Sequence, residues 1–155
     1  MDGENVLYVE YKAPADDNSF FSGFSMGKTV TAMAACQAIC AGKVKLETKA
    51  KELILELNRK ALGNATVRDL LRMASGAAEP NPDSSVWTPE EFKEWHTGEL
   101  NLLALVTQDR VAKAGRSFLS EYKPGERFSY KQSDPFVLGI MMSRETGIAL
   151  NQWAG

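Results

Sequence analysis

An apolar segment in the first third of the chain sets strong limits on the fold. Residues 26–41, MGKTVTAMAACQAICA, combine helix-forming alanines with Val30, Met33 and Ile39, and Gly42 follows as a helix stop. The apolar residues lie almost all round the expected helix axis, a pattern typical of a helix inside a protein. We therefore expect a buried helix over 26–41, around which the other elements pack.

The patterns on either side predict one strand and further helices. Residues 6–11, VLYVEY, are aromatic and β-branched and predict a short β-strand. Residues 49–60 predict a short helix or an irregular apolar segment. In NATVRDLLRMASG, at 64–76, Thr66 is the expected N-cap of a helix, with Asp69 three residues later as its reciprocal partner.

The second half of the chain predicts more helix. Thr88 is expected to begin one helix, and another is expected within residues 101–115. Asp134 is the expected cap of a last helix that ends at Gly147. The overall prediction is a single α+β domain over residues 1–155, mainly α.

Composition excludes several classes of function. The chain has 155 residues and a net charge of −2, so it lacks the basic surface that nucleic acids or anionic membranes require. No run of apolar residues is long enough for a transmembrane helix. The start, MDGE, is not that of a signal peptide, which predicts a cytoplasmic protein. If Met1 marks an artificial start, a periplasmic location stays open.

The two cysteines, Cys36 and Cys40, are four residues apart within the expected buried helix. Two residues on one helix face are poorly placed for a disulfide with each other. A metal site needs further ligands, and His96 is the only histidine. We expect both cysteines to be packed core thiols and expect no metal and no cofactor.

The tetrapeptide Ser25-Met26-Gly27-Lys28 at the start of the apolar segment allows three interpretations. Taken alone, it is most simply a helix start, with Ser25 as the N-cap and Lys28 in solvent. A phosphate-binding loop is disfavoured, because Ser22 stands where its first glycine is required. The third interpretation is catalytic. Residues three apart share a helix face, so the Lys28 amine can take the proton of the Ser25 hydroxyl.

Other candidate catalytic groups fit ordinary structural roles better. His96 lies in the charged segment EEFKEWHTGE and is expected on the surface rather than in a Ser-His-Asp triad. Glu90 and Glu91 fall in the first turn of an expected helix, where acidic side chains stabilise the helix dipole. For Trp95 and Trp153, aromatic packing is the expected role.

Three ordered blocks resemble the serine β-lactamase and DD-peptidase-like family. They are SFFSGFSMGKTVTAMAACQAICAGKVKLETK, NATVRDLLRMASG and PGERFSYKQSDPFVLGIMMSRETG. The resemblance covers about residues 5–153 and is greatest to the class C, esterase and 6-aminohexanoate-dimer-hydrolase branch. It implies the helical part of the β-lactamase-like α+β fold with an N-terminal strand, and the late strands of the sheet are missing from this chain.

The same resemblance implies the roles of individual residues. Ser25 corresponds to the acylated nucleophile, Lys28 to the base or its partner, and Tyr130 to the tyrosine that completes the proton relay. Gln132 stands where the family usually has a substrate-binding asparagine, and Trp87 follows a loop that borders the active site. The implied reaction is hydrolysis of a small-molecule amide, ester or β-lactam through an acyl-enzyme.

Two departures from the family keep an alternative open. Besides Gln132, the Lys-Thr-Gly element of a late strand is missing, and Glu145-Thr146-Gly147 is interpreted as a helix stop. A second oxyanion N–H would also come from a late strand. The alternative is an incomplete, non-catalytic fragment with a structural or interaction role. An open edge at residues 6–11 would then pair with a second copy or with a C-terminal segment.

Overall fold

The computed structural model describes residues 5–21, 23–60, 62–77, 93, 97, 122–149 and 152. The elements in chain order are η1 (Phe24–Met26), α1 (Gly27–Cys40), α2 (Ala50–Leu53), η2 (Leu55–Leu57), η3 (Leu62–Asn64), α3 (Val67–Leu71) and α6 (Ser133–Thr146). The described part contains no named β-strand, and its β-pairing is limited to isolated bridges such as that of Lys49 with Thr66. The mainly helical character expected from the sequence is therefore confirmed.

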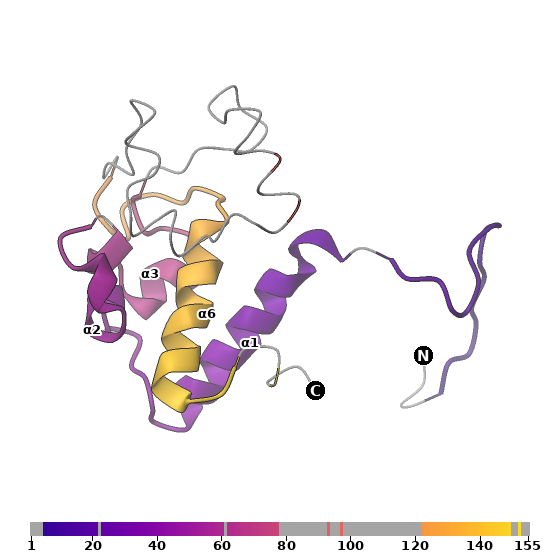
Figure 1. Cartoon of the computed structure of the whole chain (residues 1–155), viewed down its shortest axis with the longest axis horizontal. Coiled ribbons are helices and arrows are strands. Elements are labelled where there is room, and N and C mark those ends of the chain that lie inside the picture. Colours follow the sequence, from indigo (N-terminus) through magenta and orange to yellow (C-terminus); the bar gives the residue numbers. More distant parts are fainter. Residues whose placement is uncertain are drawn as a thin grey trace.

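The two long helices, α1 and α6, lie side by side and form the centre of the helical body (Figure 1). The short elements α2 and α3 also pack against α6. The fully buried side chains of the shared core include Ala35, Ala38, Ile54, Leu57, Val67, Val137, Met141 and Met142. No helix in the described ranges is long and apolar enough to cross a bilayer.

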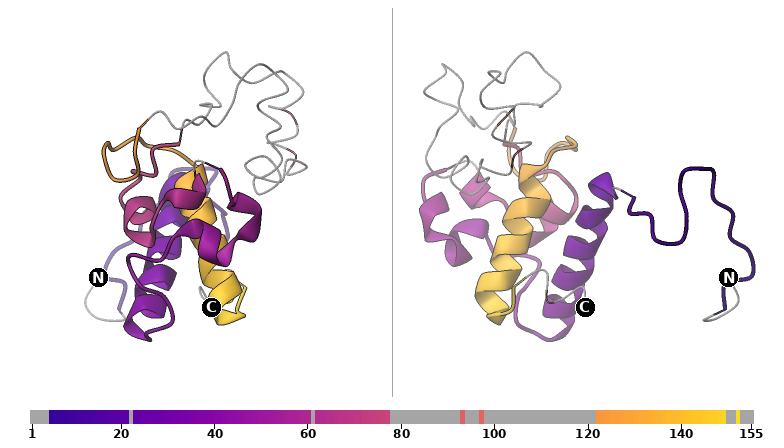
Figure 2. Two further views of the ribbon diagram at one scale, coloured as in Figure 1. Left: turned by 90° about the vertical axis from the view of Figure 1, so that its left-hand side faces the viewer. Right: turned by 45° about the vertical axis from the view of Figure 1, so that its right-hand side comes forward.

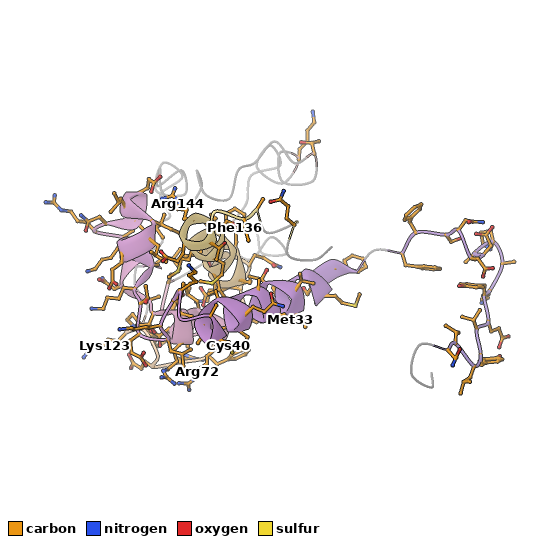
Figure 3. All side chains as sticks on the ribbon, turned by 90° about the horizontal axis from the view of Figure 1, so that it is seen from below. Met33, Cys40, Arg72, Lys123, Phe136 and Arg144 are labelled. Atoms are coloured by element: carbon orange, nitrogen blue, oxygen red, sulfur yellow. The ribbon has the colours of Figure 1, made fainter. Side chains whose placement is uncertain are left out.

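Only one face of α1 is buried. Its buried residues are Thr31, Ala34, Ala35 and Ala38. Met33 is 61% exposed, and both Cys36 and Cys40 are exposed, with Met33 and Cys40 marked along the helix in Figure 3. The prediction of a helix buried all round and the prediction of core thiols are therefore wrong for the described structure. The reason is that α6 packs on one side of α1, and the described residues leave its opposite side open.

The strand predicted over residues 6–11 is not present. These residues have no regular secondary structure, and their apolar side chains are exposed. In Figure 1 and in the right-hand view of Figure 2, the segment before α1 projects away from the helical body. A strand requires a partner for its backbone groups, and within the described residues this segment has none.

Two helix ends lie where the sequence predicts them. Thr66 and Asp69 form the predicted reciprocal capping box at the start of α3. The Thr66 Oγ1 accepts the Asp69 N–H, and the Asp69 carboxylate accepts the Thr66 N–H at 3.0 Å. At the other end of the chain, α6 ends with Gly147 at φ 70°, a left-handed conformation that suits glycine. Glu145-Thr146-Gly147 is thus the predicted helix end.

The start of α6 differs from its prediction. Its N-cap is Gln132, and Asp134 is the second helical residue. The Asp134 carboxylate accepts hydrogen bonds from Ser75 instead of capping its own helix. The helices expected from Thr88 and within 101–115 fall almost wholly outside the described residues, apart from two helical positions at 93 and 97.

Candidate active site

Ser25 lies in the short turn η1 that leads into α1. The preceding Phe24 has φ 41°, a left-handed conformation that is unusual for a bulky residue. The N-cap of α1 is Met26, and no side chain caps this helix. Neither η1 nor α1 has Ser25 as its N-cap or is capped by a side chain, so the simplest interpretation of the tetrapeptide is wrong.

Lys28 occupies the first turn of α1 and reaches back to Ser25. Its Nζ lies 2.9 Å from the Ser25 Oγ, as the spacing of three residues predicts. The same Nζ donates a hydrogen bond to the Gln132 Oε1 at 2.5 Å. The half-buried Lys28 side chain is thus held between the nucleophile candidate and the start of α6.

Tyr130 brings a second proton-carrying group to Ser25 from far along the sequence. The Tyr130 Oη lies 2.6 Å from the Ser25 Oγ, and the Lys28 Nζ lies 4.9 Å from the centre of the tyrosine ring. The hydrogen bond to Ser25, and then that to Lys28 with its charge, lower the pKa of the Tyr130 phenol. The arrangement therefore favours exchange of a proton among the three side chains.

A cavity of about 530 Å³ opens between α1 and α6 beside these groups. Ser25, Lys28 and Gln132 supply polar groups to its wall. The other lining residues are Phe24, Gly27, Thr31, Pro135, Phe136, Gly139, Ile140, Ser143 and Arg144. Two of these residues, Phe136 and Arg144, are labelled on α6 in Figure 3. Size and lining suit a small organic molecule with an apolar portion.

The structure brings together four of the five predicted site residues. The fifth, Trp87, lies outside the described residues, as do His96, Glu90 and Glu91. Within the described part, no three His, Cys, Asp or Glu side chains are grouped to hold a metal ion.

Sequence reasoning missed a buried polar cluster next to the site, formed by Ser75, Lys131 and Asp134. The hydrogen-bonded partners in this cluster are more than 50 residues apart, so no local spacing could reveal them. The available signal was the charge of Lys131 between Tyr130 and Gln132, shortly before the apolar run PFVLGIMM at 135–142.

The helical body and the site have the character of a β-lactamase-type protein. The sequence model of the beta-lactamase family matches residues 1–152, so the chain belongs to that family. This confirms the family expected from the three sequence blocks. A search of curated protein sequences gave no significant match.

Two solved structures share this fold. The chain aligns with a penicillin-binding protein from Bacillus halodurans at 22% identity and a TM-score of 0.57, over 81% of this chain and 36% of that one. A Bacillus anthracis protein described as a 6-aminohexanoate-dimer hydrolase aligns at 18% identity and a TM-score of 0.59, over 85% and 37%. Both show the fold that the sequence blocks predict. The chain spans little more than a third of the length of either protein.

Proposed function

We propose that this chain carries the acylation centre of a serine hydrolase, with Ser25 as the nucleophile. One observation carries the proposal: the Lys28 Nζ and the Tyr130 Oη both lie within hydrogen-bond distance of the Ser25 Oγ. A serine hydroxyl becomes a useful nucleophile when a neighbouring base accepts its proton. Helix capping needs neither of these two neighbours, so their presence beside the exposed Ser25 supports a catalytic role.

The proposed reaction begins when the Ser25 Oγ attacks the carbonyl carbon of an amide, ester or β-lactam. As the new C–O bond forms, the hydroxyl proton passes to the Tyr130 phenolate, which the Lys28 ammonium stabilises, or directly to Lys28 when its amine is unprotonated. The carbonyl electron pair moves onto the carbonyl oxygen. The intermediate then collapses, the bond to the leaving amine or alcohol breaks, and that group takes up the proton. Water hydrolyses the resulting acyl ester, which restores the Ser25 hydroxyl.

Tyr130 and Gln132 have distinct roles in this proposal. Because its pKa is lowered by Ser25 and Lys28, the Tyr130 phenol loses its proton more readily than an ordinary tyrosine. It can therefore pass a proton between Ser25 and the leaving group. Gln132 orients the Lys28 Nζ through its Oε1 and presents its amide to the cavity, where it contacts the substrate.

The test is covalent labelling of the protein with a fluorophosphonate or a penicillin, followed by mass-spectrometric mapping of the adduct. We expect one adduct, on Ser25, with no labelling of Ser25→Ala. Lys28→Met should lower the labelling rate by at least about 100-fold, in line with the usual contribution of a general base. Ser19→Ala is the control, because its hydroxyl bonds Asp16 in the segment before α1.

Labelling elsewhere, or equal labelling of Ser25→Ala, would contradict the proposal. Saturable stabilisation by ATP with magnesium would instead support the phosphate-loop interpretation of Lys28.

Hydrolysis of an ester substrate tests the complete reaction, whereas labelling tests only the acylation of Ser25. We expect slow turnover, since the residues that the structure describes include no strand that could supply a second oxyanion N–H beside Ser25. One missing donor typically costs about 10²–10³ in kcat. Absence of both labelling and turnover would favour the non-catalytic alternative.

A further inference from the structure

A buried cluster of polar side chains adjoins the candidate site. Ser75, Lys131 and Asp134 are at most 6% exposed. The Asp134 carboxylate accepts the Ser75 hydroxyl at 2.6 Å and the Ser75 N–H at 3.1 Å. The Lys131 Nζ donates to the Ala77 carbonyl oxygen at 2.6 Å and lies 3.5 Å from the Ser75 Oγ. The two opposite charges are thus joined through one serine.

Such a cluster needs an explanation other than stability. Removing two charges from water is costly, and an apolar replacement of similar volume is often equally stable. Burial raises the pKa of the Asp134 carboxyl, while the bonds from Ser75 and the charge of Lys131 act in the opposite direction. A satisfied buried network does, however, fix the geometry of the segments that carry it.

The segment that carries Lys131 also carries two site residues. Tyr130 and Gln132 extend to Ser25 and Lys28, whereas the side chain between them extends to Ala77 and Ser75. The hydrogen bond of the Lys131 ammonium to the Ala77 carbonyl oxygen fixes the orientation of the backbone at residues 130–132. The side chains of Tyr130 and Gln132 therefore point toward Ser25 and Lys28.

Backbone hydrogen bonds join the segment that carries Ser75 to the segment that leads to Tyr130 and Lys131. The Ser129 N–H bonds the Met73 carbonyl at 2.9 Å, and the Gly125 N–H bonds the Ala74 carbonyl at 2.7 Å. At Gly76, with φ 76°, a Cβ would lie 2.1 Å from the Tyr122 carbonyl oxygen, so the close approach requires glycine. The cluster joins this pair of segments to the first turn of α6.

We infer that Ser75, Lys131 and Asp134 are positioning residues, which hold the Tyr130 Oη and the Gln132 Oε1 against Ser25 and Lys28. None of the three lines the cavity beside Ser25, so they act through their neighbours and not on the substrate. The catalytic part of this inference rests on the proposed function. Misplacement of a reacting group by about 1 Å can cost about 100-fold in rate.

The test uses Lys131→Met, which keeps a long side chain but removes the ammonium, and Asp134→Asn, which keeps the shape of the carboxyl. We expect the maximal rate of Ser25 labelling to fall at least tenfold, with little change in the probe concentration that gives half the maximal rate. A residue with a merely structural role would not produce this split.

A second readout does not depend on catalysis. Ultraviolet titration reports the ionisation of Tyr130, which Tyr130→Phe assigns. We expect the lowered pKa of Tyr130 to move upward in Lys131→Met and Asp134→Asn, because the phenol leaves Ser25 and Lys28. Lys28 is the charged group that lowers the pKa of this phenol. Asp134→Asn keeps Lys131, and removal of a carboxylate cannot by itself raise the pKa of a phenol, so a rise in that variant reports displacement of Tyr130. Ile54→Ala, a core change in a different segment, is the control for general destabilisation.

Unchanged labelling rates and an unchanged Tyr130 titration in both variants would overturn the inference. If Lys131→Met does not fold, Ser75→Ala serves instead, because it removes the shared hydroxyl and little volume. If the wild-type protein is not labelled but its Tyr130 titration still responds to the variants, the positioning role stands and the proposed hydrolase activity fails.

Discussion

At the scale of single residues, the Tyr130 phenol is the group whose chemistry depends most on its neighbours. It is 56% exposed, yet its Oη lies beside the Ser25 Oγ and its ring beside the Lys28 ammonium. An exposed tyrosine without such contacts ionises near its usual pKa of 10.0. The lowered pKa of Tyr130 is therefore a direct report on whether the site is assembled.

Lys28→Met should raise the pKa of Tyr130 toward its ordinary value. The cation stabilises the phenolate, so its removal makes deprotonation harder, and the phenolate then forms only at higher pH. Ser25→Ala should act in the same direction, since the serine hydrogen bond is the larger cause. Ultraviolet titration of wild type, both variants and Tyr130→Phe measures the effect. An identical Tyr130 titration in wild type and Lys28→Met would contradict the described geometry.

At the scale of elements, the body depends on short helices whose ends are fixed by local bonds. The helix α3 has only five residues, Val67–Leu71, and such a short helix is not stable without its cap and its packing. Its capping box is also buried in part, since Asp69 is 8% exposed. The end of α3 leads directly into the segment that holds Ser75.

Thr66→Ala should lower the free energy of unfolding by about 1 kcal/mol, the usual effect of losing an N-cap side chain. Urea unfolding followed by circular dichroism gives the value. The matched control is Thr29→Ala, an exposed threonine within α1, where alanine has the better helix propensity. If both changes lowered the free energy of unfolding equally, the capping box of Thr66 with Asp69 would make no contribution of its own to stability.

A second prediction concerns the contact between α6 and η2. The Arg144 guanidinium binds the Glu56 carboxylate through two bonds of 2.7 and 2.8 Å, and this lowers the pKa of Glu56 to about 2. A lowered pKa in the folded state adds stability above the unfolded value of 4.5, which is lost as pH falls toward 2. Arg144→Met should remove this acid-dependent part.

The measurement compares the melting temperatures of wild type and Arg144→Met at pH 6 and at pH 3. We expect a small difference at pH 6, because both side chains are partly exposed, and a smaller one at pH 3. Added salt should reduce the difference at pH 6. The more exposed pair of Arg68 with Glu47 provides the comparison, through Arg68→Met. If the difference in melting temperature were larger at pH 3 than at pH 6, the predicted direction of the pH dependence would be wrong.

At the scale of the whole molecule, the described part has an unusual amount of exposed apolar surface. It lies on the segment before α1 and on the outer side of α1 itself. The most exposed large side chains there are Val6, Leu7, Tyr8, Val9, Phe20, Phe21, Phe24, Met26 and Met33. Exposed large apolar side chains in this number are typical of an interface rather than of a monomer in water.

We therefore expect the isolated 155-residue chain to self-associate. Light scattering over a concentration series should show dimers or larger species. The double variant Leu7→Ser/Val9→Ser should lower the mean mass, because these side chains are 70% and 57% exposed. Leu55→Ser, an exposed leucine in η2, is the control and should leave the mean mass unchanged. A monomer at all concentrations would contradict the prediction.

The sequence by itself determined those features that depend on residues close together in the chain. The limits of α1, the Thr66 capping box, the end of α6 at Gly147 and the contact of Lys28 with Ser25 all involve partners three or four residues apart. Such spacings act through the geometry of a single helical turn, so they can be predicted before any packing is known. The family was also identifiable from the order of its three blocks.

Tertiary structure alone decided which groups meet across the chain. It chose the face of α1 that is buried, and so left Cys36 and Cys40 exposed. Among the described residues it left 6–11 without a partner strand, and it directed Asp134 to Ser75 instead of to its own helix end. In each case the local sequence is compatible with more than one conformation. The choice depends on the surfaces that distant segments present, because burial and buried hydrogen bonds gain their free energy only from those contacts.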